Sequence, residues 1–171
     1  GSPSAVPVPC AHCTVSAPAG VRDSSLWRFR LSKVRAVASC PFAETLYLDN
    51  DIRLWNATRA LGWFDSMNAS VLVSGLAAPV PVPRGHETSQ VPLNFPEVNG
   101  GTLYCRCPAA KPIFRLWEHG MHSDTSKDGH DQMALRLALW AHREQFQLLP
   151  SGGATHKLVC RHRLDGNCVG V

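Results

Sequence analysis

The sequence predicts an α/β fold in which a mixed, Rossmann-like sheet is flanked by helices. Two patterns carry this prediction: short apolar, β-prone runs such as residues 45–48, and longer segments whose apolar residues recur every three or four positions. The first pattern is typical of buried strands, and the second is typical of helices that pack one face against a core. Their alternation along the chain favours α/β over an all-α or all-β class.

A chain of 171 residues, 44% of them hydrophobic and 18% charged, can bury one core of ordinary size. Residues 1–23 are rich in Pro, Ala, Ser and Val, a composition that favours an extended arm over regular structure. We therefore expect a Pro-rich arm over residues 1–23 and a single domain over residues 24–171.

The first and last helices of this domain have the clearest apolar stripes. The first stripe comprises Trp27, Leu31, Val34 and Ala38, and the second comprises Ala134, Leu137, Ala138 and Ala141, with Met133 and Trp140 beside it. Helices are expected over residues 24–40, 52–61, 111–118 and 131–147, and strands over residues 45–48, 71–73, 102–105 and 147–149. The unbroken apolar run at residues 45–48 favours a strand that is buried on both faces. Residues 76–96 and 119–130 are expected to be loops.

The charge of the chain limits its partners. The formal net charge is +4 and is spread along the sequence, which suits a small polyanion such as a nucleoside diphosphate and argues against nucleic acid. No apolar stretch approaches the roughly 20 residues that a membrane span needs. No signal peptide opens the sequence, so we expect any anchor to lie outside it.

Cysteine usage and sequons favour the secretory pathway. The seven cysteines form a C-x-x-C pair, a C-x-C pair and three single residues: Cys10 and Cys13, Cys105 and Cys107, and Cys40, Cys160 and Cys168. A Cys/His zinc module is one interpretation, and disulfides in a secreted or Golgi-lumenal glycoprotein are the favoured one. Two N-x-S/T sequons, at residues 56–58 and 68–70, point the same way.

The sharpest motif is Asp49-Asn50-Asp51, directly after the apolar run at residues 45–48. Alternate residues of an extended segment point to the same side, so both carboxylates can reach one point. The carboxyl end of a strand is where open α/β sheets bind ligands, and two hard oxygen donors suit Mn²⁺ or Mg²⁺ bridging to a diphosphate. From spacing alone, a solvated turn explains the segment equally well.

Four segments in order resemble elements of the GT-A-type nucleotide-diphospho-sugar glycosyltransferases. Residues 33–51 are similar to the Lys-containing helix, loop, strand and D-x-D of the glycogenin-like and galactosyltransferase-like groups. They are especially similar to the nucleotide-diphospho-sugar transferase group, in which a Pro-Phe pair precedes the strand. Residues 62–65, 97–103 and 129–135 resemble the Phe-Asp, Asn-Gly and Asp-Gln elements that follow. The resemblance covers about residues 30–140 and implies a GT-A-like fold.

The resemblance implies a role for each matching residue. The implied donor-binding residues are Lys33, Asp49, Asn99, Gly100 and Gly101, the implied catalytic residues are Asp131 and Gln132, and the implied metal ligands are Asp49, Asp51 and His162. The Asn-Gly-Gly segment would form a turn that lets the backbone approach the donor sugar. Without the resemblance, Asp131 is equally well explained as a helix N-cap and Lys33 as part of a solvated helix face.

The implied activity is metal-dependent transfer of a hexose or pentose from a nucleoside-diphosphate donor, foremost a UDP-sugar, to a glycan or protein hydroxyl. In the family, a strand-helix-strand unit ahead of the Lys-containing helix grips the nucleotide base. The Pro-rich residues before Lys33 do not resemble this unit, so we expect the domain to be incomplete at its N-terminus. Two alternatives stay open: a non-catalytic binding or structural module derived from the same fold, and the Cys/His zinc-binding module.

Overall fold

A computed structural model of the protein describes residues 24–49, 52–54, 57–77, 90–123, 131–149, 159–162 and 168–170. The helices are α1 (Ser24–Ser39), α2 (Ala57–Leu61), α3 (Trp63–Ser66), α4 (Lys111–His122), α5 (Asp131–Ala141) and the 3-10 helix η2 (Arg143–Gln145). The strands are β1 (Glu44–Leu48), β2 (Ile52–Leu54), β3 (Val73–Ala77), β4 (Val98–Arg106), β5 (Phe146–Leu148), β6 (Val159–His162) and β7 (Cys168–Gly170). No helix in these ranges is long and apolar enough to cross a membrane. The arm predicted over residues 1–23 lies outside the described residues.

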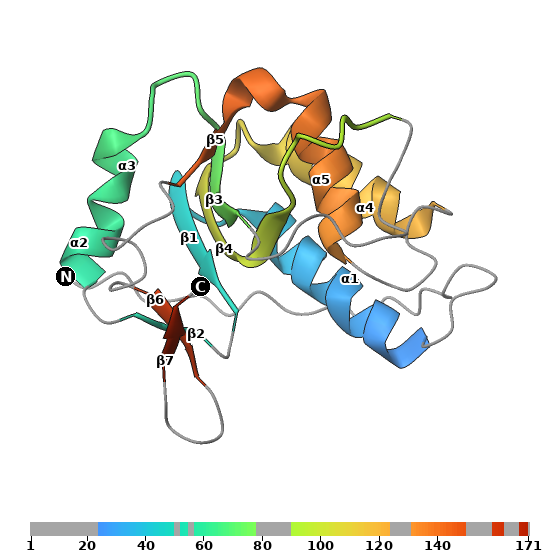
Figure 1. Ribbon diagram of the computed structural model, residues 1–171, viewed down its shortest axis with the longest axis horizontal. Helices are drawn as coiled ribbons and strands as arrows, with labels where there is room; N and C mark the ends of the chain where they lie inside the picture. Colours follow the sequence, from blue (N-terminus) through green and yellow to red (C-terminus); the bar gives the residue numbers. More distant parts are fainter. Residues whose placement is uncertain are drawn as a thin grey trace.

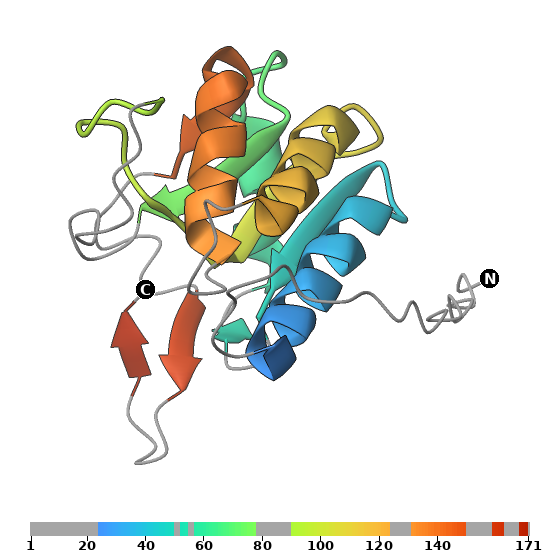
Figure 2. The same cartoon turned by 90° about the vertical axis from the view of Figure 1, so that its right-hand side faces the viewer.

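Three helices cover one face of a four-stranded sheet with the strand order β1-β4-β3-β5. Strand β4 is antiparallel to both β1 and β3, whereas β3 and β5 run parallel. Figure 2 shows α1, α4 and α5 side by side on one face, and Figure 1 shows α2 and α3 on the other side of the sheet. The predicted α/β class, with a mixed sheet flanked by helices, is therefore confirmed. A second sheet has the order β2-β6-β7.

Helix α1 follows the predicted stripe closely. Trp27, Leu31 and Val34 of the stripe are buried. Val37 is also buried, whereas Ala38 is only partly buried. The indole nitrogen of Trp27 donates a hydrogen bond to the carbonyl oxygen of Met121 at 2.9 Å, which ties α1 to α4. The helix ends two residues before Pro41, because proline disfavours helical geometry in the residue that precedes it.

Helix α4 is longer than predicted. It continues through residues 119–122, which were expected to belong to a loop. The polar and glycine residues of this turn suggest a loop in isolation, but their helical form is favoured by close packing against α5. A Cβ atom added at Gly120 would lie 3.0 Å from the Cβ of Ala134, so glycine allows the two helices to approach.

Helix α5 is shorter than predicted, and its buried face is different. It ends at Ala141, so the prediction of a helix as far as Gln147 was wrong, and the chain turns so that β5 can pair with β3. Leu135 and Leu139 are buried, whereas Leu137 on the predicted stripe is only half-buried. α5 packs against α4 and β4 at once, and a stripe of small residues does not reveal this second contact.

Strand β1 confirms the predicted strand but not its expected burial. It lies at an edge of the described sheet, where it pairs with β4. The side chains of residues 45–48 are half-buried, so the expectation of a strand buried on both faces was wrong. An apolar run indicates strand propensity, but the place of a strand in a sheet depends on pairing with distant segments.

Asn99, Gly100 and Gly101 lie within β4, so the prediction of a turn at these residues was wrong. The backbone N–H of Asp49 donates to the carbonyl oxygen of Gly101 at 2.8 Å, which extends the pairing of β1 with β4 past the end of β1. The turn preference of an Asn-Gly-Gly segment is local. It is outweighed by the pairing of β4 with β3 at Val98 and Leu103, on either side of the segment, and with β1 from Thr102 onwards.

Residues 52–54 form β2, where the sequence predicts the start of a helix, and α2 begins only at Ala57. β2 pairs with β6 in an antiparallel register that sets Ile52 opposite Arg161. This partner is too distant in sequence for any local pattern to indicate it. The strand predicted over residues 71–73 is also present, but as β3 it begins at Val73 and ends at Ala77.

A disulfide within the described residues links Cys40, just after α1, to Cys107, just after β4. The expectation of disulfides is therefore confirmed for this pair. A cysteine in a disulfide cannot also ligate zinc, so Cys107 is removed from the zinc-module alternative. Burial raises the pKa of the free thiol of Cys105 to about 12, which makes it a poor ligand as well.

Candidate functional site

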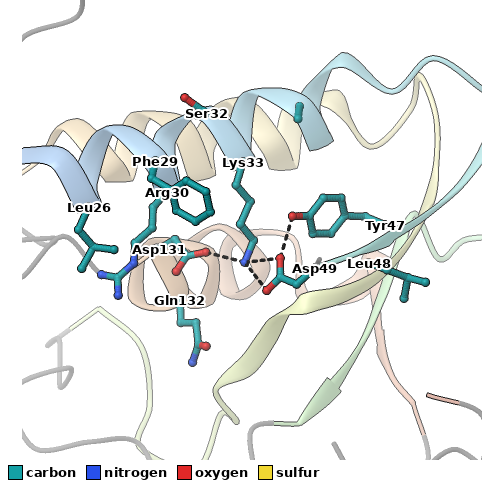
Figure 3. Close-up of a pocket in the computed structure, with 11 residues that line it drawn as sticks. Leu26, Phe29, Arg30, Ser32, Lys33, Tyr47, Leu48, Asp49, Asp131 and Gln132 are labelled. Carbon is teal, nitrogen blue, oxygen red and sulfur yellow. Dashed lines mark hydrogen bonds and ion pairs between the residues drawn. The ribbon is translucent and has the colours of Figure 1, made fainter. Parts of the chain in front are cut away.

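Helix α1, the end of β1 and the start of α5 enclose an open groove of about 610 Å³, which we name the α1 groove (Figure 3). The residues that line it include Leu26, Phe29, Arg30, Lys33, Tyr47, Asp49, Asp131 and Gln132. The α1 residues among them recur at three- and four-residue steps and so share one face of the helix, away from its buried stripe. Four residues with a predicted site role therefore line the same groove.

Lys33 lies between two carboxylates. Its Nζ atom is 3.3 Å from each oxygen of Asp49 and 3.0 Å from Oδ2 of Asp131 (Figure 3). The ammonium group is also 5.9 Å from the ring centroid of Tyr47, within the range of a cation–π interaction. The Lys33 side chain is 13% exposed, so water screens these contacts weakly.

Asp49 is held at the end of β1 by its backbone and by its carboxylate. Its N–H completes the pairing with β4 described above, and its Oδ1 accepts a hydrogen bond of 2.7 Å from the Tyr47 hydroxyl. Tyr47 reaches it because residues two apart in a strand point to the same side. The Asp49 side chain remains 32% exposed, so the carboxylate faces the α1 groove rather than the core.

Asp131 is the first residue of α5 and is nearly buried. Its backbone oxygen accepts a hydrogen bond of 2.7 Å from the indole nitrogen of Trp117, which fixes the start of α5 against α4. Its side chain is 10% exposed, and Oδ2 has Lys33 as its ionic partner and no neutral hydrogen-bond donor among the described residues. The Asp131 carboxylate therefore depends on Lys33 and on the N-terminus of α5 for stabilisation.

The two glycines of β4 lie directly beneath this cluster. A Cβ atom added at Gly101 would be 2.7 Å from Oδ2 of Asp49, and one added at Gly100 would be 3.3 Å from Nζ of Lys33. A side chain at Gly101 would displace the Asp49 carboxylate, whereas one at Gly100 would require Lys33 to shift only slightly. Asn99 contributes by accepting a hydrogen bond of 2.7 Å from the backbone N–H of Gly101.

Gln132 borders the same groove but is held by a different group. Its Nε2 donates a hydrogen bond of 2.6 Å to Oε1 of Glu97, a residue that is itself buried. Arg136, one helical turn further along α5, donates to the carbonyl oxygens of Pro92 and Phe95. Burial lowers the pKa of Arg136, and the nearby charge of Glu97 opposes this shift.

Asp49 has the chemistry of a ligand for a hard divalent cation, since it is a carboxylate that reaches the groove. Asp51, its predicted partner, and the side chain of His162 lie outside the described residues. Within the described part of the chain, no group of three or more His, Cys, Asp or Glu residues could hold a metal ion. The backbone of His162 continues β6 one position beyond Arg161, the partner of Ile52. The backbone of His162 therefore lies near the start of β2, and this start directly follows the D-x-D motif in the sequence.

The structure thus brings Lys33, Asp49, Gly100, Gly101 and Asp131 into one cluster, while Asn99 and Gln132 border it. Sequence reasoning assigned no role to Tyr47, Glu97, Phe29 or Arg30. A signal for Tyr47 existed, because it is two residues before Asp49 in an extended run. Phe29 and Arg30 precede Lys33 by four and three residues, a spacing that places them on the same helix face.

Comparison with known proteins leaves the family open. No protein-family model matches the chain, and no curated protein sequence matches it. Among solved structures, mouse xyloside xylosyltransferase 1 in its apo form matches with 17% sequence identity and a TM-score of 0.47. The match covers 74% of this chain and 51% of that chain, so this chain spans about half the length of that protein. A likeness this distant carries no conclusion about activity.

Proposed function

We propose that this chain forms part of a metal-dependent glycosyltransferase, which moves a hexose or pentose from a nucleoside-diphosphate sugar to a hydroxyl group of a glycan or protein. One observation supports the proposal above all others. Segments that resemble the donor site of GT-A-type enzymes are separated by up to a hundred residues, yet Lys33, Asp49, Gly100, Gly101 and Asp131 meet beside one groove. A chance resemblance would not lead us to expect that three of the four segments meet in this way.

We propose Asp49, Asp51 and His162 as the ligands of Mn²⁺ or Mg²⁺. The carboxylate of Asp49 in the α1 groove and the β6 backbone position of His162 support this assignment. When bound, the cation would neutralise the charge that develops on the leaving nucleoside diphosphate.

In the proposed reaction, the bond from the sugar C1 to the phosphate oxygen breaks, and the acceptor oxygen bonds to C1. The nucleoside diphosphate leaves with the electron pair of the broken bond, and the proton of the acceptor hydroxyl passes to water. We assign Lys33 to the donor phosphate or sugar, because it is the cation nearest to Asp49 in the groove. Asp131 and Gln132 are assigned to the sugar and the acceptor as the catalytic residues, since both line the groove beside Lys33.

We further propose that the protein works in the secretory pathway, in the Golgi lumen or outside the cell. The disulfide between Cys40 and Cys107 supports an oxidising compartment. Asn68, in the second sequon, is exposed and so accessible to glycosylation.

Calorimetric titration of UDP-sugars with and without Mn²⁺ tests the donor proposal. We expect binding that requires Mn²⁺ and is lost in Asp49→Asn and Asp51→Ala. Asp65→Asn is the matched control, because Asp65 is an exposed carboxylate on α3. Metal-independent binding, or no binding of any nucleoside-diphosphate sugar by the wild-type protein, would contradict the proposal.

The non-catalytic module remains the second candidate, because Lys33 pairs with both Asp49 and Asp131 and can give these residues a purely structural role. Release of UDP from UDP-sugars, with and without a mixture of glycan acceptors, distinguishes the two. Metal-dependent donor binding without UDP release favours the non-catalytic module, whereas UDP release that is lost in Asp131→Asn favours the enzyme.

A further inference from the structure

Glu97 is a buried carboxylate that has no part in the reaction proposed above. It lies one residue before β4 and is 4% exposed, and its Oε1 accepts a hydrogen bond of 2.6 Å from Nε2 of Gln132. Gln132 is itself half-buried and lines the α1 groove. A buried residue therefore holds one end of a side-chain amide that borders the groove.

The chemistry of this hydrogen bond fixes the orientation of the amide. A carboxylate accepts hydrogen bonds and cannot donate them, so Gln132 must turn its NH₂ group towards Glu97. The carbonyl oxygen Oε1 is then the part of the amide that remains for a ligand, and it accepts no hydrogen bond from the described residues. Glu97 thus decides whether Gln132 offers an acceptor or a donor to a ligand.

Arg136 explains why position 97 carries a carboxylate. Arg136 is 1% exposed; burial lowers its pKa, and the charge of Glu97 raises it. Its Nε and Nη2 atoms donate to the carbonyl oxygens of Phe95 and Pro92, whereas Nη1 has no hydrogen-bond partner among the described residues. Carbonyl groups carry no net charge, so Glu97 compensates the charge of this guanidinium. A neutral side chain of the same size would not do so.

The surroundings of Gln132 favour a ligand that donates hydrogen bonds. The cluster beside it contains two carboxylates, Asp49 and Asp131, and Lys33 is already paired with both. Figure 3 shows the Gln132 side chain extending from α5 away from Lys33, so its amide offers a contact separate from this cluster. A sugar hydroxyl can donate to the Gln132 Oε1, whereas an ionised phosphate oxygen cannot.

We propose that Glu97 is a positioning residue, which holds Gln132 so that its carbonyl oxygen accepts a hydrogen bond from a hydroxyl group of the transferred sugar. This inference rests on the proposed function and names the residue that sets the hydrogen-bonding selectivity of Gln132. A purely structural link between β4 and α5 would be complete with the bond from Nε2 to Glu97. The oxygen of the same amide, beside the groove, is the group that this link leaves for a ligand.

Calorimetric titration with UDP and with UDP-sugars, in the presence of Mn²⁺, tests the inference. The ratio of UDP-sugar affinity to UDP affinity reports the contacts of the sugar alone. Glu97→Gln should lower this ratio by about 2- to 12-fold, the range expected for loss of one hydrogen bond, and should leave UDP affinity unchanged. The new amide would turn its oxygen towards Arg136 and its NH₂ group towards Gln132, which would then turn its own NH₂ group outwards. Glu118→Gln is the matched control, because this carboxylate also pairs with an arginine but is not among the lining residues.

Two further variants test whether Glu97 acts through Gln132. Gln132→Leu should lower the ratio to the same extent, and adding Glu97→Gln to it should have no further effect. The exchanged pair Glu97→Gln/Gln132→Glu should restore the ratio, because a carboxylate at position 132 accepts from the new amide and still offers its second oxygen to the sugar. It also keeps a negative charge one helical turn from Arg136, so it tests the inference even where Glu97→Gln alone fails to fold.

An NMR spectrum of the ligand-free protein gives an independent signature. One side-chain amide proton of Gln132 should be shifted downfield by its bond to the carboxylate, and this shift should be absent in Glu97→Gln. Absence of the shift in the wild-type protein would overturn the inference.

The outcomes separate this inference from the function on which it rests. If the wild-type protein binds no UDP-sugar, the proposed function fails and the inference fails with it. If it binds UDP-sugars and Glu97→Gln keeps the wild-type ratio, only the inference is overturned. Equal loss of affinity for UDP and UDP-sugars in Glu97→Gln also overturns it, because such a loss indicates a structural role. An exchanged pair whose ratio is as low as that of Gln132→Leu has the same consequence.

Discussion

Replacing Lys33 by methionine tests whether the charge cluster holds the site together. Methionine keeps most of the volume of the lysine side chain but removes its charge. Lys33 contacts Asp49 at 3.3 Å and Asp131 at 3.0 Å, so the substitution leaves two carboxylates without their common counter-ion. The consequence is greatest for Asp131, because its side chain is 10% exposed and Oδ2 has no neutral donor among the described residues.

The expected loss of stability follows from this burial. Removing one partner of a buried ion pair costs about 3–5 kcal/mol, because the remaining charge stays buried. The N-terminus of α5 offsets about 1 kcal/mol of this cost at Asp131. Asp49, with 32% of its side chain exposed, can turn towards water. We therefore expect the free energy of unfolding to fall by about 3 kcal/mol, which for a chain of this size lowers Tm by about 6–12 °C.

Thermal unfolding followed by circular dichroism measures this loss, and α1 supplies a matched control. Arg35 on the same helix pairs with Glu118 at 2.7 Å, but these side chains are 36% and 31% exposed. Arg35→Met should therefore cost about 1 kcal/mol or less, because exposed ion pairs contribute little. The double variant Lys33→Met/Asp131→Asn should recover about 2 kcal/mol of the loss, since it also removes the unpaired charge.

Two results would refute this reasoning. A Lys33→Met protein that melts within about 2 °C of the wild type would show that Lys33 does not stabilise the buried carboxylate. A double variant that is no more stable than Lys33→Met would show that the loss does not arise from the charge of Asp131.

Three further predictions follow from packing and burial. Gly101→Ala places a Cβ atom 2.7 Å from Oδ2 of Asp49, so it should lower Mn²⁺ affinity by about 10- to 100-fold by titration while costing about 1 kcal/mol of stability. Cys107→Ala should lower the free energy of unfolding in urea by about 4 kcal/mol, because the disulfide with Cys40 closes a loop with a sequence separation of 67. The pKa of Cys105 is raised from 9.0 to about 12 by burial, so its thiol ionises first in the unfolded chain. Stability should therefore fall as pH rises from about 9 to 12, by up to about 1.4 kcal/mol per pH unit from this group, and Cys105→Ala should reduce the slope.

Each of these predictions has a control. Gly75→Ala also creates a contact of 2.7 Å, but to Cγ1 of Val98 in the core, so it should cost about 1–3 kcal/mol of stability and leave Mn²⁺ affinity unchanged. Reduction of the wild-type protein should reproduce the effect of Cys107→Ala, and no further effect of reduction is expected in that variant. If maleimide labels Cys105 in the folded protein at pH 8, its thiol is accessible and the argument from burial is wrong.

Patterns within a few residues of the sequence were enough to predict those helices and strands that are specified mainly by their own residues. The stripe of α1 and the end of this helix before Pro41 were predicted because periodic apolar residues and proline act within a few residues. The strand at residues 45–48 was found for the same reason. Helix ends were less accurate: α4 runs beyond its predicted end and α5 stops before it, because helix packing and strand pairing decide where each helix ends.

Elements stabilised by distant partners were predicted poorly. Residues 52–54 form a strand because β6 pairs with them. Residues 99–101 are extended because β4 pairs with β3 on either side of them and with β1 from Thr102 onwards. The half-buried state of β1 follows from its edge position in the described sheet. No window of local sequence contains these partners.

For the candidate site, the sequence by itself determined which residue types are present: a D-x-D motif after a strand, a lysine on a helix, two glycines and an aspartate at a helix start. It could not determine that Lys33 pairs with both Asp49 and Asp131, or that Gly100 and Gly101 make room for this cluster. It also did not reveal that Phe29 is exposed beside the same groove. Side-chain type and local spacing are properties of a short segment, whereas an ion pair forms only where the packing of α1, β1, β4 and α5 brings its atoms within a few ångströms.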